Sequence, residues 1–308
     1  DLAMREFELI RSITVHNGAL PAHVTIPPGD DMGALRLGDH ELLVAVDQVI
    51  EGVHFDRKCA TLEQIGRKAV TRNLSDVAAM AARPLATLVS AALPKGFAME
   101  DAAQLMDALR ETAQAYDAPL IGGDTATSDS PLTLCVTVLA TADGIEPVQR
   151  TGAKVGDAIY VTGQLGGSRY KYEGRTHHLD FEPRVALART LSANADTRPN
   201  AMIDLSDGLA RDLPHLVRGA EIDARLLPIT AVARQFAARD ARPGWLHAVA
   251  DGEDYELLFT ADVDAPIPRQ IDGVPITRVG KVVENGGITL IDGGERIRLE
   301  GLGWEHHG

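Results

Sequence analysis

Cysteine and aromatic residues are scarce in this chain of 308 residues. The two cysteines, Cys59 and Cys135, provide no disulfide framework, and their spacing is not that of a zinc site. Aromatic residues make up 4% of the sequence, so a core must consist mainly of Ala, Val, Leu and Ile. Such aliphatic cores suit layered α/β proteins, in which buried strands are aliphatic runs.

The chain also lacks a basic surplus and a long apolar segment. Its formal net charge of −14 argues against a nucleic-acid partner and against an anionic membrane surface. No apolar run approaches the length of a membrane span, and the amino end shows no signal-peptide pattern. We therefore expect a cytoplasmic protein that binds neither nucleic acid nor membranes.

The length and the hydrophobic periodicity predict an α/β fold with two domains. The first part has expected strands at 42–46, 86–92 and 132–142 and expected helices at 6–15, 62–82 and 99–115. The second part has expected strands at 158–162, 201–205 and 255–260 and expected helices at 183–192 and 208–218. Turn residues at 144–156 separate the two parts, so we predict domains at 1–146 and 147–308.

The most informative feature is a set of aspartates at the ends of expected strands or in turns, often beside glycine. They are Asp30 and Asp31 in PPGDDMGAL, Asp47 in LLVAVD, Asp76 in RNLSDVAAM, Asp124 in LIGGDT, and Asp204 and Asp207 in MIDLSDG. Two unit charges about 4 Å apart repel by ~4 kcal/mol at an effective dielectric constant of ~20, so clustered carboxylates need cations or protons. Mg²⁺ prefers oxygen ligands and often shares carboxylates with substrate phosphates. The set therefore predicts magnesium and phosphate chemistry.

Each acidic motif taken alone has a simpler interpretation. The GDD sequence is common in surface turns. Asp207 precedes an expected helix and could be its N-cap, and Asp76 could be a solvated charge on a helix. The functional interpretation depends on all these junctions meeting in one place.

Known nucleotide-binding motifs are missing from the sequence. The P-loop pattern fails because Gly280 and Lys281 are followed by Val282, and GQLGGS at 163–168 is not a dinucleotide fingerprint. The protein-kinase loop pattern is absent as well. The residues alone thus indicate a metal–phosphate enzyme with an unfamiliar nucleotide site.

The ordered motifs resemble those of the thiamine-monophosphate kinase family. They are GDDMGAL, VDQVIEGVHF, RKAVTRNLSDVAAMAARP, LIGGDT, RTGAKVGDAIYVTGQLG, IDLSDGLARDL, DGEDYELLFT and GWEHHG, and they run nearly from end to end. This family belongs to the superfamily of aminoimidazole-ribonucleotide synthetase and selenophosphate synthetase. The resemblance implies that ATP and thiamine monophosphate give ADP and thiamine diphosphate. It also implies an amino-terminal ATP- and magnesium-binding domain that pairs its sheet across a homodimer, and a carboxy-terminal α/β domain that closes over the site.

The resemblance also implies roles for individual residues. Several magnesium ions would be held by Asp31, Asp47, Asp76, Asp124, Asp204 and Asp207. ATP would be contacted by Gly123, Asp124, Arg150 and Ser206, and thiamine monophosphate by His54, Glu253 and Trp304. We expect no covalent nucleophile and no general base, because an acceptor phosphate is mostly unprotonated at neutral pH.

Two segments depart from the family pattern. The family usually has hydroxyl residues just before the aspartate at position 47, where this chain has Ala45 and Val46, leaving only backbone carbonyls as ligands there. The segment THHLDFEPR at 176–184 replaces a form that is usually richer in proline.

Several alternatives stay open from the sequence. His54 could be a core histidine bonded to backbone, Trp304 a packing residue, and Glu253 and Arg150 solvated charges. The closest alternative is a sister enzyme that activates an amide, formyl or selenide oxygen with ATP. A selenophosphate synthetase would need a reactive cysteine or selenocysteine near its amino end, where this chain has none, and a maturation factor that dehydrates a carboxamide would carry a terminal cysteine, whereas this chain ends in WEHHG. A non-catalytic magnesium–nucleotide sensor is a further alternative. ATP consumption with and without thiamine monophosphate separates these possibilities.

Overall fold

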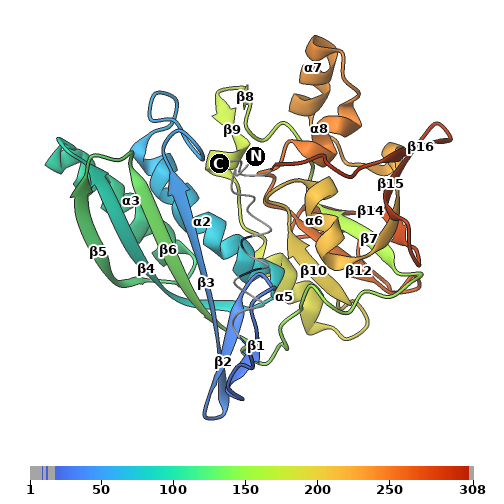
Figure 1. The fold of residues 1–308 in the computed structure, drawn as a ribbon, viewed down its shortest axis with the longest axis horizontal. Coiled ribbons are helices and arrows are strands. Elements are labelled where there is room, and N and C mark those ends of the chain that lie inside the picture. The colour runs from blue at the N-terminus through green and yellow to red at the C-terminus, as the bar shows by residue number, and fades with distance from the viewer. Residues whose placement is uncertain (1–8, 10–11, 13–17, 305–308) are drawn as a thin grey trace.

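The structure is a computed structural model that describes residues 9, 12 and 18–304. The helix expected at 6–15 falls largely on residues outside the described part. The described chain forms a two-domain α/β fold, with one sheet built from its first half and a second, larger sheet built from its second half (Figure 1). The expected α/β class is confirmed.

The first sheet has six strands in the order β1-β2-β3-β6-β4-β5. Their bounds are Val24–Ile26 (β1), Gly33–Leu37 (β2), His40–Ile50 (β3), Arg83–Pro94 (β4), Leu120–Ser128 (β5) and Thr133–Thr141 (β6). The β4–β5 pair is parallel and is joined by helix α3 (Met99–Ala115), while the other pairs are antiparallel. Helices α2 (Leu62–Ala79) and α3 pack against each other and against this sheet. Strand β5 is left as an edge of the sheet, with most of its residues exposed.

Local sequence explains where helix α2 begins and ends. Thr61 and Gln64 form a reciprocal capping box at its start. Gly66 lets α3 approach closely, because a Cβ at this position would lie 2.8 Å from the Cβ of Ala108. The helix ends at Ala79, three residues before the expected end, because the chain reverses through Ala81 in a left-handed conformation (φ 53°).

The second sheet has eight strands, seven of which follow the order β10-β12-β7-β14-β11-β15-β16, with β13 paired to β14. Their bounds are Ala158–Thr162 (β7), Ala201–Asp204 (β10), Gly219–Asp223 (β11), Leu257–Ala261 (β12), Gln270–Ile271 (β13), Val274–Val282 (β14), Gly287–Asp292 (β15) and Glu295–Arg298 (β16). A small hairpin of β8 (Lys171–Tyr172) and β9 (Arg175–Thr176) leads into helix α4 (His177–Asp180). The remaining helices are α5 (Val185–Ala193), α6 (Leu209–Leu216), η1 (Ala224–Leu226), α7 (Ala231–Asp240) and α8 (Gly244–Ala250).

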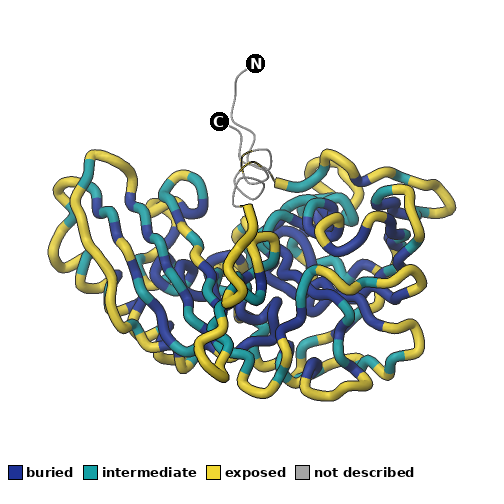
Figure 2. The backbone as a smooth tube through the Cα atoms, turned by 60° about the horizontal axis from the view of Figure 1, so that its bottom comes forward, coloured by how far each residue is buried: buried dark blue, intermediate teal, exposed yellow. Residues whose placement is uncertain are grey.

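The two halves meet around the carboxyl end of α2. Ala78, Ala79 and Ala81 pack in one buried cluster with residues of the second half, among them Leu187 and Phe259. Figure 2 shows buried chain running through the middle of the molecule between the two halves. Residues 146 and 147, where we expect the domain boundary, lie in the connection between β6 and β7. None of the helices within the described residues is long and apolar enough to cross a membrane.

Candidate active site

Three of the aspartates meet in a cavity between the two halves. Carboxylate oxygens of Asp31, Asp76 and Asp204 lie within 4.8 Å of one another. Asp31 lies in the turn between β1 and β2, Asp76 on α2, and Asp204 at the end of β10. The cavity, which we call the acidic cavity, has a volume of about 210 Å³. Its lining residues are Asp30, Asp31, Ala45, Val46, Asp47, Arg72, Asp76, Arg150, Asp204, Ser206 and Tyr255.

The carboxylates of the acidic cavity repel one another. Burial and the charge of Asp31 raise the pKa of Asp204 to about 7, although the Ser75 hydroxyl donates to its carboxylate at 2.7 Å. Burial and the charges of Asp47 and Asp204 raise the pKa of Asp76 well above its usual value. Such a cluster gains stability from a divalent cation that replaces protons.

Two arginines partly balance this negative charge. Arg150 binds Asp31 through both Nη2 (2.8 Å) and Nε (3.2 Å), and its backbone N–H donates to Asp30. Arg72 donates from Nε to Asp47 at 2.6 Å. The cavity therefore combines oxygen ligands suited to Mg²⁺ with fixed positive charges suited to phosphate.

A second cavity adjoins the first. It contains all three residues expected to contact the acceptor, His54, Glu253 and Trp304, and its full lining is Val53, His54, Arg72, Arg169, Ser206, Asp207, Asp251, Glu253, Tyr255 and Trp304. We call it the acceptor cavity. Arg72, Ser206 and Tyr255 line both cavities and so form their common wall. The two cavities are thus placed for a group to pass from one to the other.

The acceptor cavity is almost filled in this structure. Its volume of about 20 Å³ is roughly that of one water molecule. The Arg169 guanidinium lies 5.0 Å from the centre of the Trp304 ring and donates to the Val53 carbonyl at 3.1 Å. A molecule of the size of thiamine monophosphate requires these groups to move apart.

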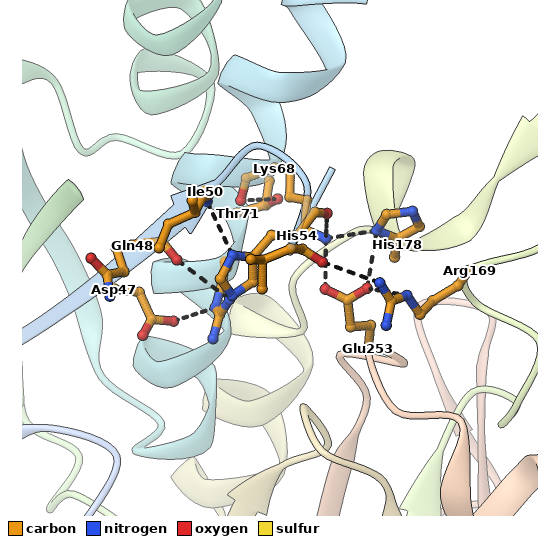
Figure 3. A network of polar contacts seen from close by, with 11 residues as sticks. Asp47, Gln48, Ile50, His54, Lys68, Thr71, Arg169, His178 and Glu253 are labelled. Atoms are coloured by element: carbon orange, nitrogen blue, oxygen red, sulfur yellow. Dashed lines mark hydrogen bonds and ion pairs between the residues drawn. The ribbon is translucent and has the colours of Figure 1, made fainter. Parts of the chain in front are cut away.

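A buried lysine connects two residues of the acceptor cavity to each other (Figure 3). Lys68 Nζ donates to the His54 carbonyl (2.7 Å) and to Glu253 Oε1 (2.6 Å), and lies 2.6 Å from His178 Nδ1. The Lys68 side chain has no exposed surface. These contacts join α2 of the first half to α4 and to the loop before β12.

The His54 ring is both a buried histidine bonded to backbone and a residue of the acceptor cavity. Its Nδ1 accepts from the Ile50 N–H at 3.0 Å, so in the neutral ring the proton sits on Nε2. The ring is buried, and it also lines the acceptor cavity.

Asp207 lies in the acceptor cavity rather than among the clustered aspartates. It is not the N-cap of α6, whose N-cap is Gly208 and has no side-chain cap bond. Asp212 instead accepts from the backbone N–H groups of Asp207 and Gly208. The capping interpretation of Asp207 is therefore wrong.

Gly123 and Asp124 lie away from both cavities within one chain. The strand register aligns Asp47 of β3 with Val136 of β6, Val89 of β4 and Gly123 of β5. Three strand spacings separate Asp47 from this position, a distance of about 14 Å. Asp124 is exposed on the edge strand, so a single chain does not bring it to the clustered aspartates.

Sequence reasoning missed Lys68, Arg72, Arg169, His178 and Tyr255. The first two were visible as basic residues on the apolar face of an expected helix, four positions apart. Asp76 follows Arg72 by another four positions, so an α-helix would place all three side chains on one side. Arg169 and His178 carried no comparable signal.

The amino-terminal half of this chain is of the AIR synthase-related class. Residues 29–142 match the family model described as AIR synthase related protein, N-terminal domain. The thiamine-monophosphate kinase of Rhodopirellula baltica is 43% identical over 252 residues, covering 80% of this chain and 77% of that protein. That of Mycobacterium tuberculosis is 31% identical, covering 98% of this chain and 92% of that protein. The solved structure of AaThiL complexed with AMPPCP and TMP superposes with a TM-score of 0.83 at 27% identity, covering 98% of this chain and 97% of that one.

The chain belongs to the thiamine-monophosphate kinase family. The expected family is thereby confirmed. The roles expected for individual residues stay predictions.

Proposed function

We propose that this enzyme transfers the γ-phosphoryl group of ATP directly to thiamine monophosphate, giving ADP and thiamine diphosphate. The observation that carries the proposal is the common wall between the acidic cavity and the acceptor cavity. A donor phosphate held among carboxylates and arginines would face an acceptor phosphate across this wall. The relatives' names and the AMPPCP and TMP complex of AaThiL support the same pair of substrates.

The acidic cavity fits magnesium. Its donors are carboxylate oxygens, and Asp31, Asp76 and Asp204 place them close enough to share an ion. We propose that these three residues, together with Asp47, hold magnesium with the ATP phosphates. Bound magnesium would neutralise phosphate charge and align the two substrates.

The groups of the chain itself orient the reactants. Arg150 lies in the acidic cavity, where its positive charge suits a polyphosphate, and Ser206 lies between the two cavities. Glu253 lines the acceptor cavity, and its negative charge suits a cationic acceptor such as the thiazolium ring of thiamine. Hydrogen bonding from His178 and the charge of Lys68 outweigh the effect of burial and keep the pKa of Glu253 below its usual value, so the carboxylate stays ionised.

The transfer needs no proton to move. An unprotonated oxygen of the acceptor phosphate forms a bond to the γ-phosphorus of ATP. The bond from that phosphorus to the bridging oxygen breaks, and its electron pair stays on ADP. The second pKa of a phosphate monoester is near ~6, so no general base is required at neutral pH.

We further propose that the first sheet pairs across a homodimer. Strand β5 is an exposed edge, and exposed edges of this length are usually covered by another chain or element. Ile121 on β5 and Val46 on β3 are 62% and 59% exposed, and both would be covered in such a dimer. In such a dimer, Gly123 and Asp124 of one protomer would complete the acidic cavity of its partner.

The test is a direct assay of the purified protein. ATP, magnesium chloride and thiamine monophosphate should yield equal amounts of ADP and thiamine diphosphate, measured by chromatography. ATP consumption without diphosphate formation would favour a sister enzyme, and binding of AMPPCP without turnover of any phosphorylated acceptor would favour a sensor. A stoichiometric phosphoprotein formed with ATP alone would replace direct transfer with a two-step route.

A further inference from the structure

Arg72 and Tyr255 are not among the residues for which the sequence predicted a role. Both line the acidic cavity and the acceptor cavity, and thus form the wall that a transferred phosphoryl group must pass. Arg72 comes from the middle of α2 and Tyr255 from the loop before β12, so the two halves of the molecule each contribute one group.

The Arg72 guanidinium is oriented, but its hydrogen-bonding capacity is not used up. Its Nε donates to Asp47 at 2.6 Å, and its Nη1 makes one long contact of 3.5 Å with the Gln48 carbonyl. Nη2 makes no hydrogen bond to any residue in the described part of the chain. A guanidinium has five N–H donors and keeps its charge at every relevant pH, so most donors remain available for a phosphoryl oxygen.

The Tyr255 hydroxyl is a second available donor. Tyr255 is 2% exposed, and its hydroxyl has no hydrogen-bond partner among the described residues. A buried hydroxyl without a partner costs stability, so its retention in a wall between two cavities needs a reason. Burial raises the pKa of Tyr255 well above its usual value, so the hydroxyl keeps its proton and can donate.

The ring of Tyr255 is firmly positioned. It stacks on Phe181 with 4.0 Å between ring centres and an angle of 14°. The residue has a left-handed backbone conformation (φ 51°), which is unfavourable for a non-glycine residue and is maintained only by its surroundings. The Tyr255 side chain is thus held in one place beside the two cavities, although its backbone conformation is unfavourable.

We propose that Arg72 and Tyr255 are catalytic residues that donate hydrogen bonds to the phosphoryl group while it passes from the acidic cavity to the acceptor cavity. The inference rests on the proposed function and adds two direct contacts to it. Negative charge spreads over the three equatorial oxygens of the phosphoryl group in transfer, and donors fixed in advance at that position stabilise it. Asp47 acts as the positioning residue for Arg72.

A purely structural role for both residues is the competing interpretation. Arg72 could serve only to neutralise Asp47, and Tyr255 only to pack on Phe181. The two interpretations differ for Tyr255→Phe, which keeps the ring and removes the unpartnered hydroxyl. A structural role predicts unchanged turnover, whereas the proposed contact predicts a loss of turnover without a loss of stability.

The first experiment measures steady-state kinetics and thermal unfolding of three variants in the full-length protein. We expect kcat to fall about 100-fold in Arg72→Gln and roughly 10-fold in Tyr255→Phe. Arg72→Lys, which keeps the charge without the planar fork, should recover part of the loss. The melting temperature of Tyr255→Phe should equal or exceed that of the wild type.

The matched control is Arg67→Gln. Arg67 lies on the same helix and bonds the Phe181 carbonyl (2.8 Å) and Glu182 (2.9 Å), but lines neither cavity. It reports what the loss of an arginine from α2 does to the contact between the halves. Wild-type kcat in both Arg72→Lys and Tyr255→Phe, or an equal loss in Arg67→Gln, would overturn the inference.

A binding experiment separates this inference from the identity of the acceptor. With magnesium chloride present, Arg72→Gln should weaken AMPPCP at least fivefold in calorimetry and change ADP binding less than twofold, because only AMPPCP carries a third phosphoryl group. Equal changes for both nucleotides would overturn the role of Arg72, even if wild-type protein makes thiamine diphosphate. If the wild type makes none but the nucleotide difference appears, the proposed acceptor is wrong and the role of Arg72 stands.

Discussion

Lys68 of α2 and Glu253 of the loop before β12 form a buried ion pair across the two halves of the molecule, with 2.6 Å between Nζ and Oε1. Burial lowers the pKa of Lys68 to about 8, even though the charge of Glu253 opposes this shift. The pair has a direct geometric effect, because Lys68 also holds the His54 carbonyl and so fixes two residues of the acceptor cavity at once.

Removing this lysine should therefore cost much more than a surface charge would. We expect Lys68→Met to lower the free energy of unfolding by about 3–5 kcal/mol, because the Glu253 carboxylate would be left buried without its main cation. Denaturant titration by circular dichroism measures this change. The double variant Lys68→Met/Glu253→Gln should recover part of the loss, and a single-variant effect below ~1 kcal/mol would show that the pair contributes little.

The acidic cavity gives a prediction about magnesium and stability. Without magnesium, Asp204→Asn should be at least as stable as the wild type, because it removes one of several repelling carboxylates while keeping an acceptor for Ser75. Magnesium chloride should raise the melting temperature of the wild type and raise that of the variant much less. Differential scanning fluorimetry, with calcium and sodium chlorides as controls, measures both effects. Equal shifts of the melting temperature in the two proteins would show that Asp204 does not bind the metal.

Asp254 gives a prediction about pH. Burial raises the pKa of this carboxyl to about 8, although Oδ1 accepts from the Gly166 N–H at 2.9 Å and from the Ser168 hydroxyl. Between pH 4 and 8 the folded chain therefore holds a proton that the unfolded chain has released, so this group lowers stability as pH rises.

Asp254→Asn keeps an acceptor oxygen and removes the titration. Its stability relative to the wild type should therefore increase with pH from 4 to 8, by up to about 1.4 kcal/mol per pH unit. Denaturant titrations of both proteins at pH 5, 6.5 and 8 measure the difference. A difference that stays constant with pH would mean that Asp254 is ionised in the folded protein throughout this range.

The proposed dimer makes a prediction about mixed subunits. Asp47→Asn and Asp124→Asn should each abolish most turnover and leave the fold intact. If Asp124 serves the partner's cavity, a heterodimer of the two variants has one site with both aspartates changed and one site with neither changed. Random mixing at equal amounts should then restore about a quarter of wild-type activity, since half of the dimers are mixed and each has one intact site.

The control is each variant mixed with itself under the same unfolding and refolding conditions. No recovery in the mixture of variants, with recovery of wild-type protein treated in parallel, would place both aspartates in the same protomer's site.

The sequence was most informative where pattern and local structure agree. The helix expected at 99–115 and the strand expected at 158–162 match α3 and β7 in the structure. Strand β5 was not expected, because the glycines of LIGGDT favour a turn, and its side chains, exposed at the sheet edge, lack the alternation of a half-buried strand. Strands β15 and β16 were missed because both are short and lie between glycine-rich turns, and β16 is mostly charged.

The local sequence could also indicate which aspartates are candidates for a metal site, but not which of them lie close together in the fold. Asp31, Asp76 and Asp204 come from a turn, a helix and a strand end, and only the packing of α2 between the two halves brings them together. Asp207 follows Asp204 by three residues and lines the other cavity. The common wall depends on Arg72 and Tyr255, which are 183 positions apart in the chain.

Helix α2 contributes residues of one of its sides to both cavities. Lys68, Arg72 and Asp76 follow one another at intervals of four residues, so they lie on one side of the helix about 6 Å apart along its axis. If the proposed roles hold, this one helix sets the distances between the acceptor, the phosphoryl group in transfer and the metal-bound donor. Inserting a single residue between 68 and 76 would turn one part of the helix by about 100° against the other, and would therefore separate Asp76 from the side that carries Lys68.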